Sequence, residues 1–132
     1  MIQVFKYSKH IKLWKLVKQS WNLVREHGLV NTKIFLRRCY LNDQEEIPNS
    51  CYACLYAEEQ RANKLVSKCR YCPLEIGECS NVNSIYRQIC NSITSDNRAV
   101  FEGLCDYMID AKVKPDVECE VDETNADKPE RV

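Results

Sequence analysis

The chain has 132 residues, and its contents of 45% hydrophobic and 29% charged residues are ordinary for a globular domain. Only three glycines are present, which argues against a fold of strands and tight turns and predicts a mainly α-helical one. No apolar run is long enough to cross a membrane and no export signal is recognisable, so we expect a cytoplasmic protein without membrane contact.

The formal net charge is zero, but the charges are segregated along the chain. Residues 1–39 carry nine Lys or Arg and one acid, residues 40–94 carry five and seven, and residues 95–132 carry five and eleven. The three segments therefore have charges of +8, −2 and −6. This asymmetry indicates either a nucleic-acid or acidic-protein partner, or two ends that neutralise each other within the fold.

Helical spacing of large apolar residues predicts an amphipathic helix from Ser8 to His27, with Gly28 placed to end it. The apolar stripe of this helix consists of Trp14, Val17, Trp21 and Val24. Residues 31–41 follow, with Asn31 or Thr32 able to cap a short helix. We expect a helix there, although the apolar and aromatic residues of this segment would also suit a strand.

Basic residues of this N-terminal part are the candidate partner-binding residues. They are Lys9, Lys12, Lys15, Lys18, Arg37 and Arg38. The four lysines recur at every third position and wind slowly around the polar side of the predicted helix. They indicate a contact with phosphate groups or with an acidic protein, and the alternative is a solvated helix face.

Two C-x2-C pairs dominate the middle of the chain. They are Cys51-Tyr-Ala-Cys54 and Cys69-Arg-Tyr-Cys72, and fourteen residues separate them. Each pair offers two thiolates from one tight turn, and four thiolates complete the tetrahedron of a structural zinc site. The sequence therefore predicts that Zn²⁺ is bound by these four cysteines, with Cys79 either a replacement for one of them or a protonated neighbour.

Other uses of these cysteines are less well supported by the sequence. Tetrathiolate sites also hold iron, but rubredoxin-like knuckles usually place glycine where Leu55 and Pro73 stand. A redox dithiol lacks the surrounding βαβ pattern. A closed tetrathiolate site leaves no open position for catalysis, and the nucleotide-deaminase pattern is absent. We therefore expect no enzyme activity and no small-molecule substrate.

The remaining cysteines and histidines are predicted to have structural roles. We interpret Cys39, Cys90, Cys105 and Cys119 as packing residues. His10 and His27 have no acid at ligand or base spacing, so we expect them at a helix surface or a helix end.

Three further helices complete the prediction. A helix of about two turns over residues 55–62, followed by an extended return, would bring the two C-x2-C pairs together. A second helix begins at Ser80 or Asn81, and a third runs from Ser95 or Asp96 to about Asp110 as its antiparallel neighbour. Residues 1–113 are expected to form one zinc-stapled helical domain with its zinc module at 51–79. Residues 114–132 read as an acidic, disordered tail, with a marginal edge strand at 117–121 as the alternative.

The residues Cys51-x-Ala-Cys54-x-Tyr-Ala, Cys69-x-Tyr-Cys72-Pro-Leu and Cys79, with Tyr86 and the earlier Leu13-Trp14, resemble a group of small zinc-binding proteins carried by bacteriophages and prophages. The resemblance covers residues 51–86 specifically and the flanks loosely. It implies an accessory protein in a bacterial host cell, without enzyme activity. Such a protein would bind a host protein, for example a nucleic-acid or defence enzyme, and inhibit or regulate it. The alternative is a nucleic-acid-binding zinc protein that uses the basic N-terminal helix.

Overall fold

A computed structural model describes residues 4–47, 51–61, 72–75, 85–115 and 117–119. The predicted mainly helical fold is confirmed: the described residues form six helices, and their only β pairings are two isolated bridges. The helices are α1 (Tyr7–Lys18), α2 (Trp21–His27), α3 (Leu29–Tyr40), α4 (Tyr52–Arg61), α5 (Ile85–Thr94) and α6 (Arg98–Asp110). No helix among these described residues is both long and apolar enough to cross a membrane.

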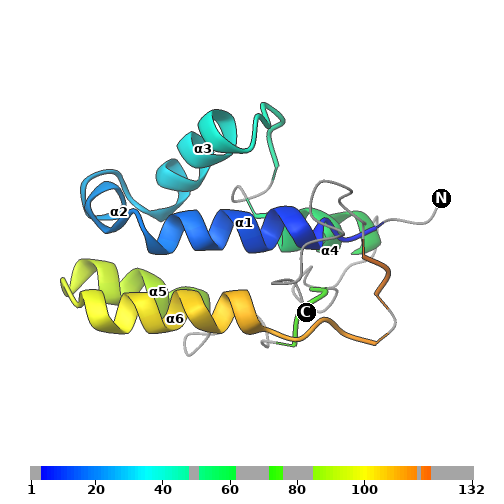
Figure 1. The fold of residues 1–132 in the computed structure, drawn as a ribbon. Coiled ribbons are helices and arrows are strands. Elements are labelled where there is room, and N and C mark those ends of the chain that lie inside the picture. The colour runs from blue at the N-terminus through cyan, green and yellow to red at the C-terminus, as the bar shows by residue number, and fades with distance from the viewer. Residues whose placement is uncertain (1–3, 48–50, 62–71, 76–84, 116, 120–132) are drawn as a thin grey trace, which may run out of the picture.

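Helix α1 lies at the centre of the arrangement and contacts α6, α3, α4 and α2 (Figure 1). Its apolar stripe is fully covered, with Leu13, Trp14 and Val17 each no more than 1% exposed. Helices α5 and α6 form a hairpin, and α6 runs antiparallel beside α1 (Figure 1). The core therefore lies between the first helix of the chain and the last.

The predicted helix over residues 8–27 is interrupted, because α1 ends at Lys18 and α2 begins at Trp21. At the break, the Ser20 hydroxyl donates a hydrogen bond of 2.7 Å to the carbonyl of Leu16. A serine that bonds to the backbone in this way competes with the helical hydrogen-bond pattern. The apolar stripe continues into α2, where Trp21 and Val24 are buried as predicted.

Gly28 ends α2 as predicted. Its φ of 89° is one that residues other than glycine rarely adopt. The helix expected over residues 31–41 is confirmed as α3, which begins two residues earlier. The helix expected over residues 55–62 is confirmed as α4, but it starts at Tyr52, so Cys54 lies in its first turn. The predicted start of the next helix, at Ser80 or Asn81, lies outside the described residues.

Helix α6 ends at Asp110 as predicted but begins later than expected. Its N-cap is Asn97, whose side chain accepts a hydrogen bond of 3.2 Å from the backbone N–H of Val100. The sequence-based choice of Ser95 or Asp96 was wrong because Asp96 adopts a positive φ of 58° in the turn. The predicted antiparallel packing against α5 is confirmed (Figure 1).

The described part of the C-terminal segment returns to the start of the chain. The Phe5 N–H donates a hydrogen bond of 2.8 Å to the carbonyl of Glu118, and Phe5 and Cys119 form a parallel bridge. Leu74 and Val113 form the second, antiparallel bridge. Val113, Val117 and Cys119 therefore pack against the helical core, and residues 120–132 are outside the described part.

Candidate functional site

The cysteine pair at the start of α4 is the most chemically distinctive group of the described residues. Cys51 immediately precedes the helix, and its carbonyl accepts a hydrogen bond of 3.0 Å from Leu55. The thiol and the backbone N–H of Cys54 both hydrogen-bond to the Cys51 sulfur. These bonds hold the pKa of Cys51 well below its usual value, against the effect of burial and with help from the charge of Lys33. The thiolate, the form that binds metals, is favoured.

The other predicted zinc ligands are only partly within the described residues. Cys72 is 6% exposed and belongs to the same core cluster as Cys51. Cys69 and Cys79 lie outside the described residues. Within the described part of the chain, no three His, Cys, Asp or Glu side chains come together as a metal-binding group. Cys51 and Cys54 fit one half of a tetrathiolate site, and the complete site stays a prediction.

A buried polar network joins α3 and the residues just after it to the first residue of α4. The Arg37 guanidinium lies 3.3 Å from the Asp43 carboxylate, and the Tyr52 hydroxyl donates a hydrogen bond of 2.6 Å to the same carboxylate. Arg37 also donates to the carbonyl of Glu45. Burial acts to raise the pKa of Asp43, but its hydrogen bonds from Tyr52 and Glu45 and the Arg37 charge lower it overall. The network fixes Tyr52, the neighbour of Cys51.

His10 lies in the core, and its predicted place at a helix surface was wrong. The ring is 1% exposed, and its Nε2 lies 3.0 Å from the carbonyl oxygen of Met108 in α6. Burial lowers the pKa of His10, so the neutral ring, which donates to that carbonyl, is favoured. His27 is exposed at the end of α2, as predicted.

The scattered cysteines differ in their surroundings. Cys105 is buried in α6, and burial raises its pKa to about 12, which suits the predicted packing role. Cys90 and Cys119 are partly buried against the core. Cys39 is exposed, so its interpretation as a packing residue was wrong.

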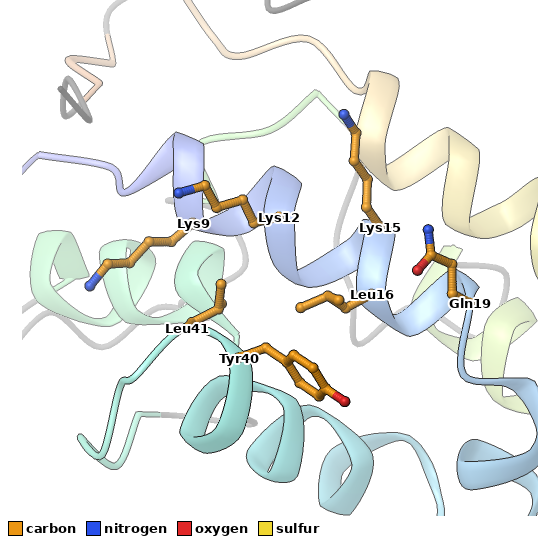
Figure 2. Close-up of a pocket in the computed structure, with 7 residues that line it drawn as sticks. All are labelled: Lys9, Lys12, Lys15, Leu16, Gln19, Tyr40 and Leu41. Atoms are coloured by element: carbon orange, nitrogen blue, oxygen red, sulfur yellow. The ribbon is translucent and has the colours of Figure 1, made fainter. Parts of the chain in front are cut away.

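Three of the predicted partner-binding lysines line one groove between α1 and the end of α3 (Figure 2). The groove has a volume of about 560 Å³. It is lined by Lys9, Lys12, Lys15, Leu16, Gln19, Tyr40 and Leu41. Leu16, Leu41 and the Tyr40 ring lie between the two helices, and the lysines extend from α1 (Figure 2). The groove is thus apolar between the two helices and is surrounded by lysines of α1, whose amines point in different directions (Figure 2).

The other predicted basic residues are not part of this groove. Lys18 forms an ion pair of 2.8 Å with Asp106 of α6. Arg37 is 2% exposed in the network described above, so it cannot serve as a surface contact. Arg38 is exposed on α3.

Two residues of interest were not predicted as site residues. Tyr40 is 64% exposed at the groove, and Lys33 is completely buried. No sequence signal predicts this behaviour. An aromatic residue near the end of a helix is usually buried, and a lysine in a helix is usually solvated.

Comparison of the chain with models of protein families, with curated proteins and with solved structures found no match.

Proposed function

We propose that this protein is a zinc-stapled protein-binding module. It binds an acidic segment of another protein in the groove between α1 and α3. In this proposal it is a phage-type accessory protein of the bacterial cytoplasm, without enzyme activity, that inhibits or regulates a host nucleic-acid or defence enzyme. The observation that carries the proposal is the gathering of Lys9, Lys12 and Lys15 along an apolar groove.

The composition of the groove indicates what kind of segment would bind. The three lysines around the groove favour carboxylates, and their positive charge raises the rate at which an acidic partner associates. Leu16, Leu41 and Tyr40 offer apolar area to a side chain of the same segment, and such buried contacts supply most of the binding energy. An acidic stretch with an apolar anchor therefore fits both parts of the groove.

Zinc has a structural part in this proposal. The ligands would be Cys51, Cys54, Cys69 and Cys72, with Cys79 as a substitute or neighbour. The C-x2-C spacing and the contact between Cys51 and Cys54 support it. A zinc ion bound by four thiolates would stabilise the fold and have no open coordination position. The helices would make the contact with the partner.

A second candidate function, binding of single-stranded nucleic acid, is favoured by one observation. Tyr40, which lines the lysine-lined groove, and Phe35 are 64% and 47% exposed, and the centroids of their rings lie 6.5 Å apart. Exposed aromatic rings next to a row of lysines can stack on bases while the lysines contact phosphates.

The experiment compares the wild-type protein with two triple variants as immobilised baits in bacterial lysate. The groove variant is Lys9→Gln, Lys12→Gln, Lys15→Gln. The control variant removes the same charge elsewhere: Arg87→Gln, Arg98→Gln, Lys112→Gln. We expect the wild-type and control proteins to retain a partner protein that the groove variant loses. Equal retention by all three baits would contradict the proposal.

Nuclease treatment of the lysate separates the two candidate functions. A protein partner stays bound after treatment, whereas a nucleic-acid ligand, and any protein held through it, is lost. For nucleic acid, the affinity should also fall steeply with salt, and each removed lysine that contacts a phosphate should reduce the salt slope by roughly one. Tyr40→Ala should then weaken binding as well.

A further inference from the structure

A second pocket, here called the α2–α3 pocket, has a volume of about 320 Å³. It is lined by Leu23 and His27 of α2 and by Asn31, Thr32 and Phe35 of α3. None of these residues lines the groove between α1 and α3. The volume lies at the lower end of the range for ligand sites, so the pocket suits a single side chain or a small ring.

The chemistry of the α2–α3 pocket differs from that of the groove. Its lining includes no Lys, Arg, Asp or Glu, whereas three lysines line the groove. Leu23 and Phe35 supply apolar surface, and Phe35 is 47% exposed. An exposed aromatic ring favours contact with a second ring, edge to face or offset. The pocket therefore favours an uncharged aromatic group.

Thr32 supplies the polar contact of this pocket. Of the five lining residues it alone is buried, at 2% exposed. Its backbone N–H donates a hydrogen bond of 3.1 Å to the carbonyl of Gly28, but its hydroxyl has no hydrogen-bond partner among the described residues. Buried hydroxyl groups are nearly always hydrogen-bonded. A ring with one polar atom at its tip would supply the bond, after a small side-chain movement of the kind that is common on binding, because Oγ1 is covered in this structure.

The α2–α3 pocket and the groove belong to one surface. Phe35 lines the pocket, Tyr40 lines the groove, and the centroids of their rings lie 6.5 Å apart. The eight-residue step from Thr32 to Tyr40 along α3 rises about 12 Å. An extended peptide covers that distance with roughly three or four residues. One segment can therefore occupy both sites.

We propose that the α2–α3 pocket is a second anchor site for the partner protein, which takes an uncharged aromatic side chain with a hydroxyl at its tip, as in tyrosine. This inference rests on the proposed function and narrows the kind of partner. The partner segment would place an acidic stretch and an apolar anchor at the groove, and a tyrosine three or four residues away in the α2–α3 pocket.

The test is an NMR titration of the isotopically labelled full chain with small probes at millimolar concentrations. The probes are p-cresol, which corresponds to the tyrosine side chain, toluene, which lacks the hydroxyl, and adenosine, which carries a nucleobase. We expect p-cresol to shift the amide signals of the residues that line the α2–α3 pocket.

Three variants locate the site and its hydrogen bond. Thr32→Val keeps the shape of the side chain and removes the hydroxyl, so the affinity for p-cresol should fall roughly three- to tenfold while that for toluene stays the same. Phe35→Ala removes one wall and should weaken both probes. Val100→Ala is the matched control, because Val100 of α6 is 46% exposed, and it should bind both probes like the wild type. If Thr32→Val does not fold, Thr32→Ala serves, with the ratio of the two affinities as the readout.

The outcomes separate this inference from the proposed function. It is overturned if p-cresol does not bind, if it shifts signals away from α2 and α3, or if Thr32→Val binds it as the wild type does. Adenosine that binds more tightly than p-cresol, and is weakened by Thr32→Val, would assign the pocket to a nucleobase and also overturn the inference. The proposed function fails by a different result, retention of the partner by the groove variant, since that variant changes only lysines of the groove.

Discussion

Neighbouring residues of one helix have opposite environments at the end of α3. Arg37 is 2% exposed and pairs with the buried carboxylate of Asp43, whereas Arg38 next to it is exposed. The two side chains point about 100° apart around the helix axis, so one meets the loop before α4 and the other meets water. The guanidinium group of Arg37 therefore has a structural role, whereas that of Arg38 is available for contacts at the surface.

This difference gives a prediction with an internal control. Arg37→Ala should lower the free energy of unfolding by about 3 kcal/mol or more, because it leaves the buried Asp43 carboxylate without its positively charged partner. Arg38→Ala should change it by less than about 0.5 kcal/mol. Urea denaturation of both variants is the measurement. Similar midpoints for the two would show that Arg37 is not held in the buried ion pair.

The buried polar residues also show where sequence reasoning stops. The zinc ligands were proposed from spacing alone, and the lysines of the groove from their recurrence, because both patterns are local. His10 and Lys33 are buried by contacts with residues far along the chain, such as the carbonyl of Met108, and no local pattern encodes these. His10 was therefore assigned to a helix surface or a helix end, and Lys33 was not singled out at all.

At the scale of elements, apolar spacing predicted the helices well and their ends less well. The stripe of α1 and α2 was correct across the break at Ser20, because the spacing of buried residues depends on the helix period. The break itself depends on one side-chain hydrogen bond to the Leu16 carbonyl. Helix α6 started later than predicted for a similar reason, since three polar residues competed for the N-cap.

Helix α6 provides a second matched pair. Phe101 is 0% exposed and its ring packs 5.0 Å from that of Trp21, whereas Val100 is 46% exposed. Phe101→Ala should destabilise the protein by about 3 to 5 kcal/mol through loss of burial and the cavity left behind. Val100→Ala should change stability by less than about 0.5 kcal/mol, with alanine favoured by helix propensity. Thermal unfolding, followed by circular dichroism, is the measurement. Equal melting temperatures of the two variants would contradict the burial of Phe101.

For the molecule as a whole, the zinc proposal implies that metal and fold are coupled. Apparent binding energies of structural zinc are on the order of 10 kcal/mol, comparable with the total stability of a small domain. The proposed ligands Cys51 and Cys54 lie at the start of α4, which packs on the central helix α1. Loss of the ion should therefore destabilise α4 and its packing on α1, and not the cysteines alone.

We predict that removal of metal by a chelator lowers the helical circular-dichroism signal and the melting temperature. Cys51→Ser should reproduce this effect, because it removes one of the proposed ligands. Cys39→Ser, a change at an exposed cysteine outside the motif, should leave both the zinc content and the spectrum unchanged. An unaltered spectrum and melting temperature, with the metal confirmed absent, would remove zinc from the account of stability.

The packing of α1 against α6 has a consequence for how the chain is made on the ribosome. The ion pair between Lys18 and Asp106 joins residues that are 88 positions apart. At a synthesis rate of about 5 to 20 residues per second, roughly 4 to 18 s pass between their additions to the nascent chain. Throughout that interval the face of α1 that packs against α6 has no α6 to cover it. The first helix to leave the exit tunnel therefore waits for the helix with which it makes its largest contact, and a chain that ends before residue 98 lacks α6 altogether.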